Sequence, residues 1–446
     1  MADFAKDLQM AREIATRVQK LGGRVFFVGG YVRDAFLQRE NKDIDIEVHG
    51  VSSAQLQSVL NECGERLEMG ESFGIYALKG YSLDIAMPKD AAGTDAPFIG
   101  EQNAASRRDF TCNAMMQDVL SGEVLDFFGG KEDLANGILR HVDDQTFAED
   151  PLRVLRAAQF AARFGFSVAE ETVAICKQLD LSGIARERIE AELKKALLKS
   201  RRPSVFFDVL RRMEQLNGWF AELYALIGVE QNLRFHAEGD VYTHTMMVVD
   251  EAAKLRKRVS EPFGFMLGAL VHDFGKAVCT ENINGVIHAY HHETKGLPIA
   301  KAFLERITAE QKVISMALNL TELHMKPVMQ ARAGSSMKSM NKMFDAAIDA
   351  QALLCLALAD DRGRFSQAAS EDCEEKLSAA LEVYRQTMAQ PYVMGRDLIE
   401  AGLRAGPDFT ELLAYAHKLR LAGVEKKHAL KQTLAYARTL EKRKEC

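Results

Sequence analysis

Residues 24–37 read Arg-Val-Phe-Phe-Val-Gly-Gly-Tyr-Val-Arg-Asp-Ala-Phe-Leu, and residues 42–48 follow as Lys-Asp-Ile-Asp-Ile-Glu-Val. The first five residues favour a strand, and a helix is expected from Tyr31 to Leu37. Gly29 and Gly30 lie between them and have no Cβ, so the backbone of this turn can approach a phosphate closely. The stretch therefore predicts a strand, a phosphate-binding turn and a helix.

Two aspartates, Asp43 and Asp45, alternate with isoleucines on the next expected strand. A period of two places both carboxylates on one face. Because strands disfavour aspartate, such a pair indicates a function, although two surface aspartates beside a turn are the plainer alternative. Carboxylates next to a phosphate-binding turn suit Mg²⁺ and a nucleoside triphosphate in two-metal phosphoryl transfer. Asp84, on a further expected strand, is either a third carboxylate or an edge-strand charge.

The composition indicates a soluble protein of several domains. The chain has 446 residues, of which 47% are hydrophobic and 27% charged, values that are ordinary for globular proteins. We expect a cytoplasmic location and no membrane partner, because no apolar run approaches the roughly 20 residues of a membrane span and the seven cysteines form no C-x-x-C pair. The net charge of -6 argues against a general nucleic-acid coat but allows a local basic groove.

Strand and helix patterns alternate up to about residue 145, and helical periodicity dominates after Asp150. The expected fold class is therefore α+β, with a mixed β-sheet in an N-terminal head and an all-α remainder. We expect a head at 1–145, a helical neck at 146–227, a third domain at 228–375 and a helical tail at 376–446. The elements expected in the head are a helix over 1–21, strands at Val25–Val28, Ile44–Val48, Ile75–Leu78 and Ser82–Ala86, and a helix at Ser53–Asn61.

A second polar motif, Asp150-Pro-Leu-Arg-Val-Leu-Arg, begins the helical region. Asp150 is a good helix cap, and proline suits the first helical position. Arg153 and Arg156 are three residues apart, so they share one side of the helix. They form either a binding site or a solvated face. Asp150 likewise has either a capping role or a role in recognition.

These motifs, in their order and spacing, resemble the signature of the class II tRNA nucleotidyltransferases and the related bacterial poly(A) polymerases. The resemblance covers nearly the whole chain. The segments that carry it are Gly29-Gly30-Tyr-Val-Arg33-Asp34, Asp43-x-Asp45, Arg107-Arg-Asp-Phe-Thr-Cys-Asn-Ala, Asp126-Phe-Phe-Gly-Gly-Lys-Glu-Asp-Leu, Glu149-Asp-Pro-Leu-Arg-Val-Leu-Arg-Ala and Glu187-Arg-Ile-Glu-Ala-Glu-Leu.

The resemblance implies template-independent addition or repair of the 3′-terminal CCA of tRNA from CTP and ATP. Catalytic Asp43 and Asp45 would hold Mg²⁺ and activate the tRNA 3′-hydroxyl. Asp150 and Arg153 would pair with the edge of the incoming base, with Arg156 in support. The remaining residues assigned to the nucleotide are Gly29 and Gly30 at the triphosphate, Arg33, which would bind the triphosphate or buttress the metal site, and Arg107 and Arg108 at the triphosphate or ribose, oriented by Asp109. A salt-bridged loop is the alternative for the last three.

One segment departs from the family pattern. Between Asp84 and Arg107 the chain is short and has one lysine and no arginine. In the family, a longer basic loop acts as a lever for the change from C to A addition, and enzymes that add only C-C lack it. The resemblance therefore leaves open whether this chain stops at C-C.

The second half contains a His-Asp dyad, His272-Asp273, and several separate histidines and aspartates. Such a set is typical of a hydrolytic metal centre, and its order resembles the HD phosphohydrolase superfamily. That resemblance implies a divalent transition metal or Mg²⁺. One metal would be held by His244, His272, Asp273 and Asp360, and a second by His292 and His324, with Asp361 an alternative to Asp360 and His236, His288 and His291 less certain.

Two other functions remain open. A poly(A) polymerase of the same family would add long A tails from ATP alone. A metal-dependent phosphohydrolase could carry a head that only binds nucleotide or RNA. The partners implied by the leading interpretation are the tRNA 3′ end, CTP and ATP. The basic segments at 187–202 and 426–444 are expected either to contact RNA or to be solvated, and the oligomeric state does not follow from the sequence.

Overall fold

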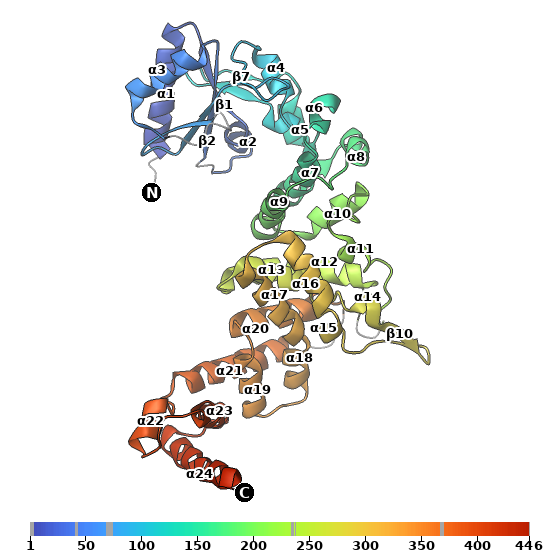
Figure 1. The fold of residues 1–446 in the computed structure, drawn as a ribbon. Helices are drawn as coiled ribbons and strands as arrows, with labels where there is room; N and C mark the ends of the chain where they lie inside the picture. Colours follow the sequence, from blue (N-terminus) through green and yellow to red (C-terminus); the bar gives the residue numbers. More distant parts are fainter. Residues whose placement is uncertain are drawn as a thin grey trace. The chain divides into compact units, whose positions relative to one another are not determined.

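The computed structural model describes residues 4–40, 43–67, 75–232, 236, 238–365 and 370–445 and is drawn in Figure 1. The chain forms two compact units. Unit 1 comprises Met1–Leu193 and Val205–Trp219, and unit 2 comprises Lys194–Ser204 and Phe220–Cys446. The expected boundary at residue 145 between head and neck is therefore not a break between compact units, because the first neck helices belong to unit 1.

A mixed, seven-stranded sheet organises unit 1, in the order β3-β4-β5-β2-β1-β6-β7. Strands β2 and β5 run parallel, whereas the other neighbours are antiparallel. The parallel pair places the expected catalytic strand at the centre of the sheet. The strands are β1 (Arg24–Val28), β2 (Ile44–His49), β3 (Arg66–Leu67), β4 (Ile75–Leu78), β5 (Leu83–Ala86), β6 (Met116–Asp118) and β7 (Val124–Leu125).

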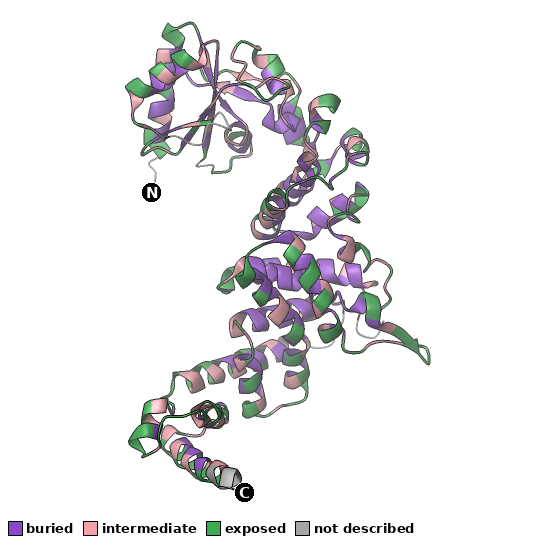
Figure 2. Ribbon diagram, in the orientation of Figure 1, coloured by how far each residue is buried: buried purple, intermediate pink, exposed green. Residues whose placement is uncertain are grey.

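Helices α1 (Phe4–Lys20) and α3 (Ser53–Cys63) pack together beside the sheet, and Figure 2 shows their buried inner sides. Ile14 and Val18 of α1 are fully buried because apolar residues recur at helical spacing. Helix α3 begins at a Ser52–Gln55 capping box. Unit 1 also contains α2 (Gly30–Phe36), α4 (Glu101–Ser106), η1 (Thr111–Asn113), α5 (Gly130–Asn136), β8 (Ile138–Leu139), α6 (Asp144–Ala148), α7 (Leu152–Phe164), β9 (Ser167–Val168), α8 (Glu170–Cys176) and most of α9 (Arg186–Lys199) and α10 (Ser204–Arg212).

Unit 2 is a helical assembly around α13 (Pro262–Val271), in which every residue from Phe263 to Val271 is buried. This helix is apolar all round, which is typical of a central helix. It packs on α12 (Val241–Leu255), α17 (Gln311–Leu323) and α20 (Ala350–Arg362). The other elements are α11 (Ala221–Tyr224), η2 (Arg256–Arg258), α14 (Lys276–Cys279), β10 (Thr280–Ile283), β11 (Val286–Ala289), α15 (His292–Lys295), α16 (Leu297–Ile307), α18 (Met325–Arg332), α19 (Met337–Asp345), α21 (Ser370–Ala389), α22 (Gly395–Glu400), α23 (Asp408–Leu421) and α24 (Lys426–Glu445).

The expected fold class is confirmed: a mixed sheet in the N-terminal part and a mainly helical remainder. The β10–β11 hairpin and the two-residue pairing of β8 with β9 are additions that helical periodicity did not predict. In the described parts of the chain, every helix is too short or too polar to cross a membrane.

Candidate functional site

The turn after β1 brings backbone close to a charged site. Gly29 has φ +62°, a conformation that disfavours side chains. A Cβ at this position would lie 3.9 Å from Arg108 Nη1 and 4.0 Å from Asp45 Oδ2. The turn expected from the sequence therefore lies directly beside one of the two predicted catalytic aspartates.

Carboxylates gather at the centre of the sheet. Asp45 of β2 lies opposite Asp84 of β5 in their parallel register. Asp43 immediately precedes β2 and is exposed. Burial raises the pKa of Asp45, and the charges of Asp84 and Asp43 raise it further, whereas Arg108 opposes them. Because these negative charges disfavour one another, the arrangement is suited to a divalent cation.

The carboxylates at the sheet border a cavity of about 460 Å³. A second polar site, in unit 2, has a cavity of about 380 Å³. Asp45 and Asp84 line this larger cavity together with three arginines from other elements, Arg107, Arg108 and Arg153. It therefore has acidic and basic walls, and its volume is in the range of small-molecule sites.

Each arginine of this cavity is held by the protein. Arg108 pairs with Glu47 of β2, and Arg107 Nη2 lies 2.6 Å from Glu149 Oε2. Burial disfavours the charge of Glu47, but Arg108 and His49 outweigh it and lower the Glu47 pKa. Arg153 donates to the Thr146 carbonyl at 2.5 Å and to the Arg107 carbonyl at 2.9 Å. These bonds orient the guanidinium groups before any ligand arrives.

The side-chain carboxylate of Asp109, which the resemblance implies would orient Arg107 and Arg108, pairs with a different arginine. Its Oδ2 accepts from Arg156 Nη2 at 2.6 Å and Nε at 2.8 Å, and its Oδ1 accepts from Asn113. Burial disfavours the charge, but Arg156 and these hydrogen bonds lower the Asp109 pKa. Asp109 therefore fixes Arg156, which a loop motif alone does not reveal.

Of the two roles expected for Arg33, its position favours support of the site over contact with the triphosphate. It is buried, and its guanidinium bonds Asp34 and Asn113. The group lies 5.2 Å from the Phe160 ring centre and 4.6 Å from that of Phe164. Arg33 is not among the described residues that line the cavity. Its contacts fasten α2 to η1 and to α7.

The start of α7 presents Asp150. The helix begins at Leu152, one residue later than the expected start at Pro151, and Asp150 Oδ1 accepts from Leu152 N at 3.2 Å. Its other oxygen, Oδ2, accepts from Arg188 Nη2 at 2.8 Å. Both interpretations of Asp150 thus remain compatible with its position. Arg188 was not singled out from the sequence, although it lies in the quoted segment that begins at Glu187.

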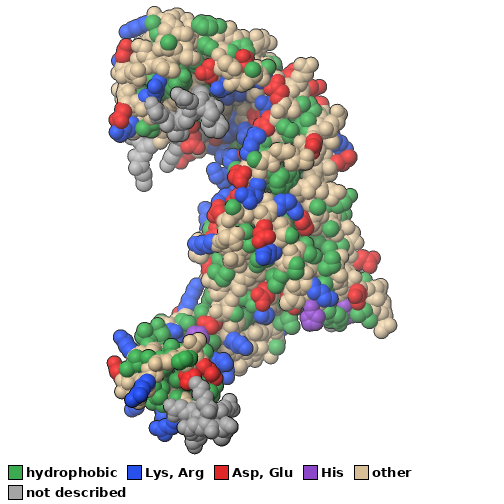
Figure 3. Space-filling model, viewed as in Figure 1, with side chains coloured by type: hydrophobic (Ala, Val, Ile, Leu, Met, Phe, Trp, Pro, Cys, Tyr) green, Lys and Arg blue, Asp and Glu red, His purple; other side chains and the backbone are tan. Residues whose placement is uncertain are grey.

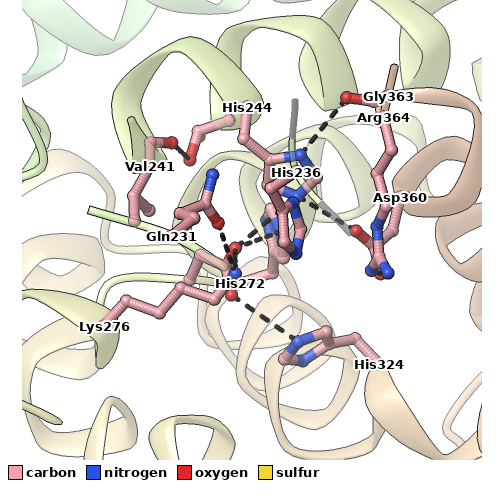
Figure 4. A network of polar contacts seen from close by, with 12 residues as sticks. Gln231, His236, Val241, His244, His272, Lys276, His324, Asp360, Gly363 and Arg364 are labelled. Atoms are coloured by element: carbon pink, nitrogen blue, oxygen red, sulfur yellow. Dashed lines mark hydrogen bonds and ion pairs between the residues drawn. The ribbon is translucent and has the colours of Figure 1, made fainter. Parts of the chain in front are cut away.

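Unit 2 contains the histidine–aspartate cluster shown in Figure 4. In three of its histidines, Nδ1 lies 2.7–2.8 Å from the backbone carbonyl oxygen of the residue three positions earlier. The pairs are His272 with Ala269, His292 with Ala289, and His324 with Thr321. Because Nδ1–H donates to that carbonyl, each Nε2 lone pair is directed into the cluster. This is the arrangement that orients metal-binding imidazoles.

Three groups of ligand atoms in the described residues lie within 4.8 Å of one another, and two of them consist only of the six expected ligands: His244, His272 and Asp360, and Asp273, His292 and His324. The third joins His236 and His244 to Glu238. Asp273 lies between the first two groups, with Oδ2 3.2 Å from His272 Nε2 and Oδ1 3.2 Å from His292 Nε2. Burial, followed by the neighbouring His272, lowers the His324 pKa to about 3, so its imidazole is neutral, as a metal ligand must be. The six expected residues therefore lie together.

Charged neighbours complete this cluster. Lys276 Nζ lies 2.7 Å from Asp273, and Arg364 Nη2 lies 2.5 Å from Asp360 Oδ2. Asp361 instead contacts Arg332 at 3.2 Å, so the choice between the two adjacent aspartates falls on Asp360. The less certain histidines differ: His236 lines the cavity of about 380 Å³ at the cluster, His288 also lines it and stacks on Tyr290, and His291 is exposed.

Glu238 was missed by the sequence reasoning. Its Oε1 lies 2.8 Å from His236 Nδ1 and 3.0 Å from His244 Nδ1. Burial opposes its charge, but these two histidines lower the Glu238 pKa. The residue follows no regular spacing from the dyad, so only the fold brings it to His244.

Comparison with known proteins places the chain in a family. A model of the poly A polymerase head domain matches residues 25–140. The chain is 35% identical over 318 residues to the multifunctional CCA protein of Actinobacillus pleuropneumoniae serotype 5b (strain L20), covering 68% of this chain and 75% of that relative. The chain belongs to the multifunctional CCA protein family. A family member from Pasteurella multocida (strain Pm70) is 34% identical over 363 residues, 76% of this chain and 84% of the relative.

Solved structures share the fold across nearly the whole chain. A CCA-adding enzyme in complex with ATP has a TM-score of 0.70 at 20% identity, covering 97% of this chain and 94% of the other. The Thermotoga maritima CCA-adding enzyme complexed with tRNA has a TM-score of 0.66 at 19% identity, with 98% of both chains covered. The Bacillus stearothermophilus enzyme with CTP has a TM-score of 0.66 at 23% identity and covers 98% of this chain and 99% of the other.

Proposed function

We propose that this chain is a template-independent nucleotidyltransferase that adds CCA to tRNA 3′ ends from CTP and ATP. The observation that carries this proposal is the cavity in which Asp45 and Asp84 face Arg107, Arg108 and Arg153 beside the Gly29 turn. Membership in a family named for CCA, and relatives solved with ATP, CTP and tRNA, supply the substrate class.

The proposed reaction forms one bond and breaks one. The tRNA 3′-oxygen bonds to the α-phosphorus of the nucleotide, and the bond from that phosphorus to the bridging oxygen breaks, which releases pyrophosphate. Asp43 and Asp45 would hold Mg²⁺, with Asp84 as a third carboxylate; the ion lowers the pKa of the attacking hydroxyl and offsets developing charge. Arg107 and Arg108 bind the triphosphate, and the backbone at Gly29 and Gly30 approaches it.

Base selection is assigned to Asp150 and Arg153. Arginine presents a planar donor fork and aspartate accepts, so together they match the polar edges of C and A. Arg153 is already fixed by two backbone carbonyls, and Asp150 is held by Arg188. Arg156 supports them through its bonds to Asp109. A rigid protein template of this kind needs no nucleic-acid template.

We further propose a metal-dependent phosphohydrolase in unit 2. The supporting observation is the buried set His244, His272, Asp273, His292, His324 and Asp360. Within it, His272 Nε2 and both Asp273 carboxylate oxygens lie 2.7–3.2 Å from charged or imidazole neighbours but form no hydrogen bond of good geometry with a described residue. Buried polar atoms in this state are suited to metal ligation. These residues fit a divalent transition metal or Mg²⁺, which would supply an activated water for attack on a phosphoester.

Extension of tRNA lacking its CCA end tests the first proposal. With CTP and ATP, we expect a product three nucleotides longer, sized on a denaturing gel at single-nucleotide resolution. Arrest after two residues would show that the short segment after Asp84 limits the chain to C-C. Long tails from ATP alone would identify a poly(A) polymerase, and no extension would overturn the proposal.

Hydrolysis of bis-p-nitrophenyl phosphate tests the second proposal. Activity after loading with Ni²⁺, Mn²⁺ or Mg²⁺ should disappear in His272→Ala, while Asp45→Asn retains it. If both variants hydrolyse the ester like the wild type, the cluster is not the hydrolytic centre.

A further inference from the structure

A row of arginines and phenylalanines runs along one side of α7. Arg153, Arg156, Phe160 and Arg163 follow one another at intervals of three and four residues, so they share one side of the helix. Arg153 lines the nucleotide cavity at the start of this row. At a rise of about 1.5 Å per residue, Arg163 lies roughly 15 Å further along the helix. The row therefore leads away from the proposed base-selection site.

The row is built from stacked rings and guanidinium groups. Phe160 and Phe164 stack with centroids 5.6 Å apart, and Arg33 lies over both rings. At the far end, Arg39 lies 4.8 Å and Arg163 5.1 Å from the Phe164 centroid. Such packing holds these guanidinium groups in place without neutralising their charge.

Only part of this charge is neutralised. Asp109 pairs with Arg156, and Asp34 pairs with Arg33. Arg39 and Arg163 form no ion pair with another residue that the structure describes. Burial and the nearby charges of Arg33 and Arg39 lower the Arg163 pKa, and Asp34 and Asp43 offset only part of this effect. Positive charge is thus concentrated at this end of the row.

We propose that Arg39 and Arg163 bind phosphates of the 3′-terminal segment of the tRNA acceptor strand and direct its end toward Asp43. This inference rests on the proposed nucleotidyltransferase function and adds a primer-binding surface to it. Arginine binds phosphate through its planar fork. Arg39 is four residues before Asp43 in the chain, so at most about 14 Å separates it from the carboxylate that would activate the 3′-hydroxyl.

The nucleotide itself is a poorer occupant for this surface. Neither Arg39 nor Arg163 is among the described residues that line the nucleotide cavity. The triphosphate is assigned to Arg107 and Arg108, so a separate anionic strand is the ligand that the second surface fits. Figure 3 shows Lys and Arg side chains gathered beside α7 and α9, where they meet the head.

A double-mutant cycle between protein and RNA tests the assignment. The probe is a synthetic acceptor-stem hairpin that lacks CCA and carries a neutral methylphosphonate at one of its last three 3′ linkages. Binding is measured by fluorescence anisotropy, which requires no catalysis. Arg163→Ala and Arg39→Ala should each weaken binding of the unmodified hairpin by roughly threefold to fivefold, and each should reduce the salt dependence.

At one of the three linkages, the methylphosphonate should weaken wild-type binding but cause no further loss in Arg163→Ala or Arg39→Ala. Arg17→Ala is the matched control because Arg17 is in the same unit and is already paired with Glu13 and Glu62. In this variant, each methylphosphonate should weaken binding as much as it does in the wild type. Arg163→Lys keeps the charge and should recover part of the affinity, and thermal melting verifies folding.

Additive losses at all three linkages for both variants would overturn the inference. That outcome would leave the nucleotidyltransferase function intact if the wild type still extends tRNA. Conversely, coupled losses in a protein that does not extend tRNA would reject the proposed reaction but retain the phosphate-binding surface.

Discussion

Replacement of Asp45 by asparagine should stabilise the metal-free protein while it abolishes nucleotide addition. In the folded protein, burial and the charges of Asp84 and Asp43 raise the Asp45 pKa. The folded state therefore holds this proton more tightly than the unfolded chain. The cost of ionisation is absent below the ordinary aspartate pKa and is complete once the pH exceeds the raised pKa. An asparagine side chain cannot ionise and has no such cost, so the variant gains stability at neutral pH.

The register of the sheet gives the magnitude. Adjacent strands lie about 4.8 Å apart, and two like charges about 5 Å apart repel by about 3 kcal/mol at an effective dielectric constant near 20. Asp84 is exposed, so solvent screens a large part of this repulsion. We expect a gain of about 1 kcal/mol in the free energy of unfolding of unit 1, because like charges directly opposite in a sheet destabilise by this order.

Trp219, the single tryptophan, belongs to unit 1, so its fluorescence reports urea unfolding of that unit. In EDTA, Asp45→Asn should exceed the wild type in stability at about pH 8, and the difference should shrink as the pH falls through the raised pKa. Millimolar Mg²⁺ should stabilise the wild type more than the variant, since a ligand of the folded state stabilises it.

Asp118→Asn is the control, because its change in the free energy of unfolding should have the opposite sign. Burial opposes the Asp118 charge, but hydrogen bonds from Ser121, Leu120 and Arg24 outweigh it and lower the Asp118 pKa. This variant should therefore lose stability at neutral pH. A loss of stability in Asp45→Asn in EDTA at about pH 8, or an equal Mg²⁺ effect in variant and wild type, would refute the reasoning.

Three further predictions concern residues that the fold brings together. Asp109→Ala leaves Arg156 half-buried without its carboxylate, so the free energy of unfolding followed by Trp219 should fall by about 3 kcal/mol; an unchanged value would show that the pair is not important for stability. Arg188→Ala releases Asp150 and should lower kcat/KM for CTP by roughly fivefold; in an Asp150→Ala background it should have little further effect, whereas additive losses would contradict the coupling. His272→Ala should lower the number of metal ions bound after dialysis, measured by atomic emission, while CTP incorporation stays at the wild-type rate; full metal content would reject His272 as a ligand.

Local pattern predicted much of this molecule. The strands around Gly29 and Asp45 have clear periodicity, so their place in one head followed from the sequence. The resemblance of the His272-Asp273 dyad and its companions to the HD superfamily predicted that six residues of unit 2 would lie together, as they do, although Asp273 groups with His292 and His324 rather than with His244 and His272. Strand order does not follow from periodicity, since the parallel pairing that brings Asp84 opposite Asp45 depends on crossover through the fold.

What the sequence did not reveal are the partners of charged side chains. The bond from Arg156 to Asp109 and the bond from Arg188 to Asp150 each join segments that are separated by a loop or helix. Arg33 was expected to bind the triphosphate or to buttress the metal site, but its packing against two rings of α7 was not predicted. Glu238 joins two histidines only because the loop before α12 folds onto that helix. Such pairings are tertiary, and no local pattern encodes them.

The most direct test of the account is tRNA extension by three proteins in parallel: the wild type, Asp45→Asn and His272→Ala. Each receives tRNA without its CCA end, CTP, ATP and Mg²⁺, and the products are sized and sequenced. We expect addition of C-C-A by the wild type and by His272→Ala, and no addition by Asp45→Asn. Extension by Asp45→Asn at the wild-type rate, or its loss in His272→Ala alone, would contradict the assignment of nucleotide addition to the cavity of unit 1.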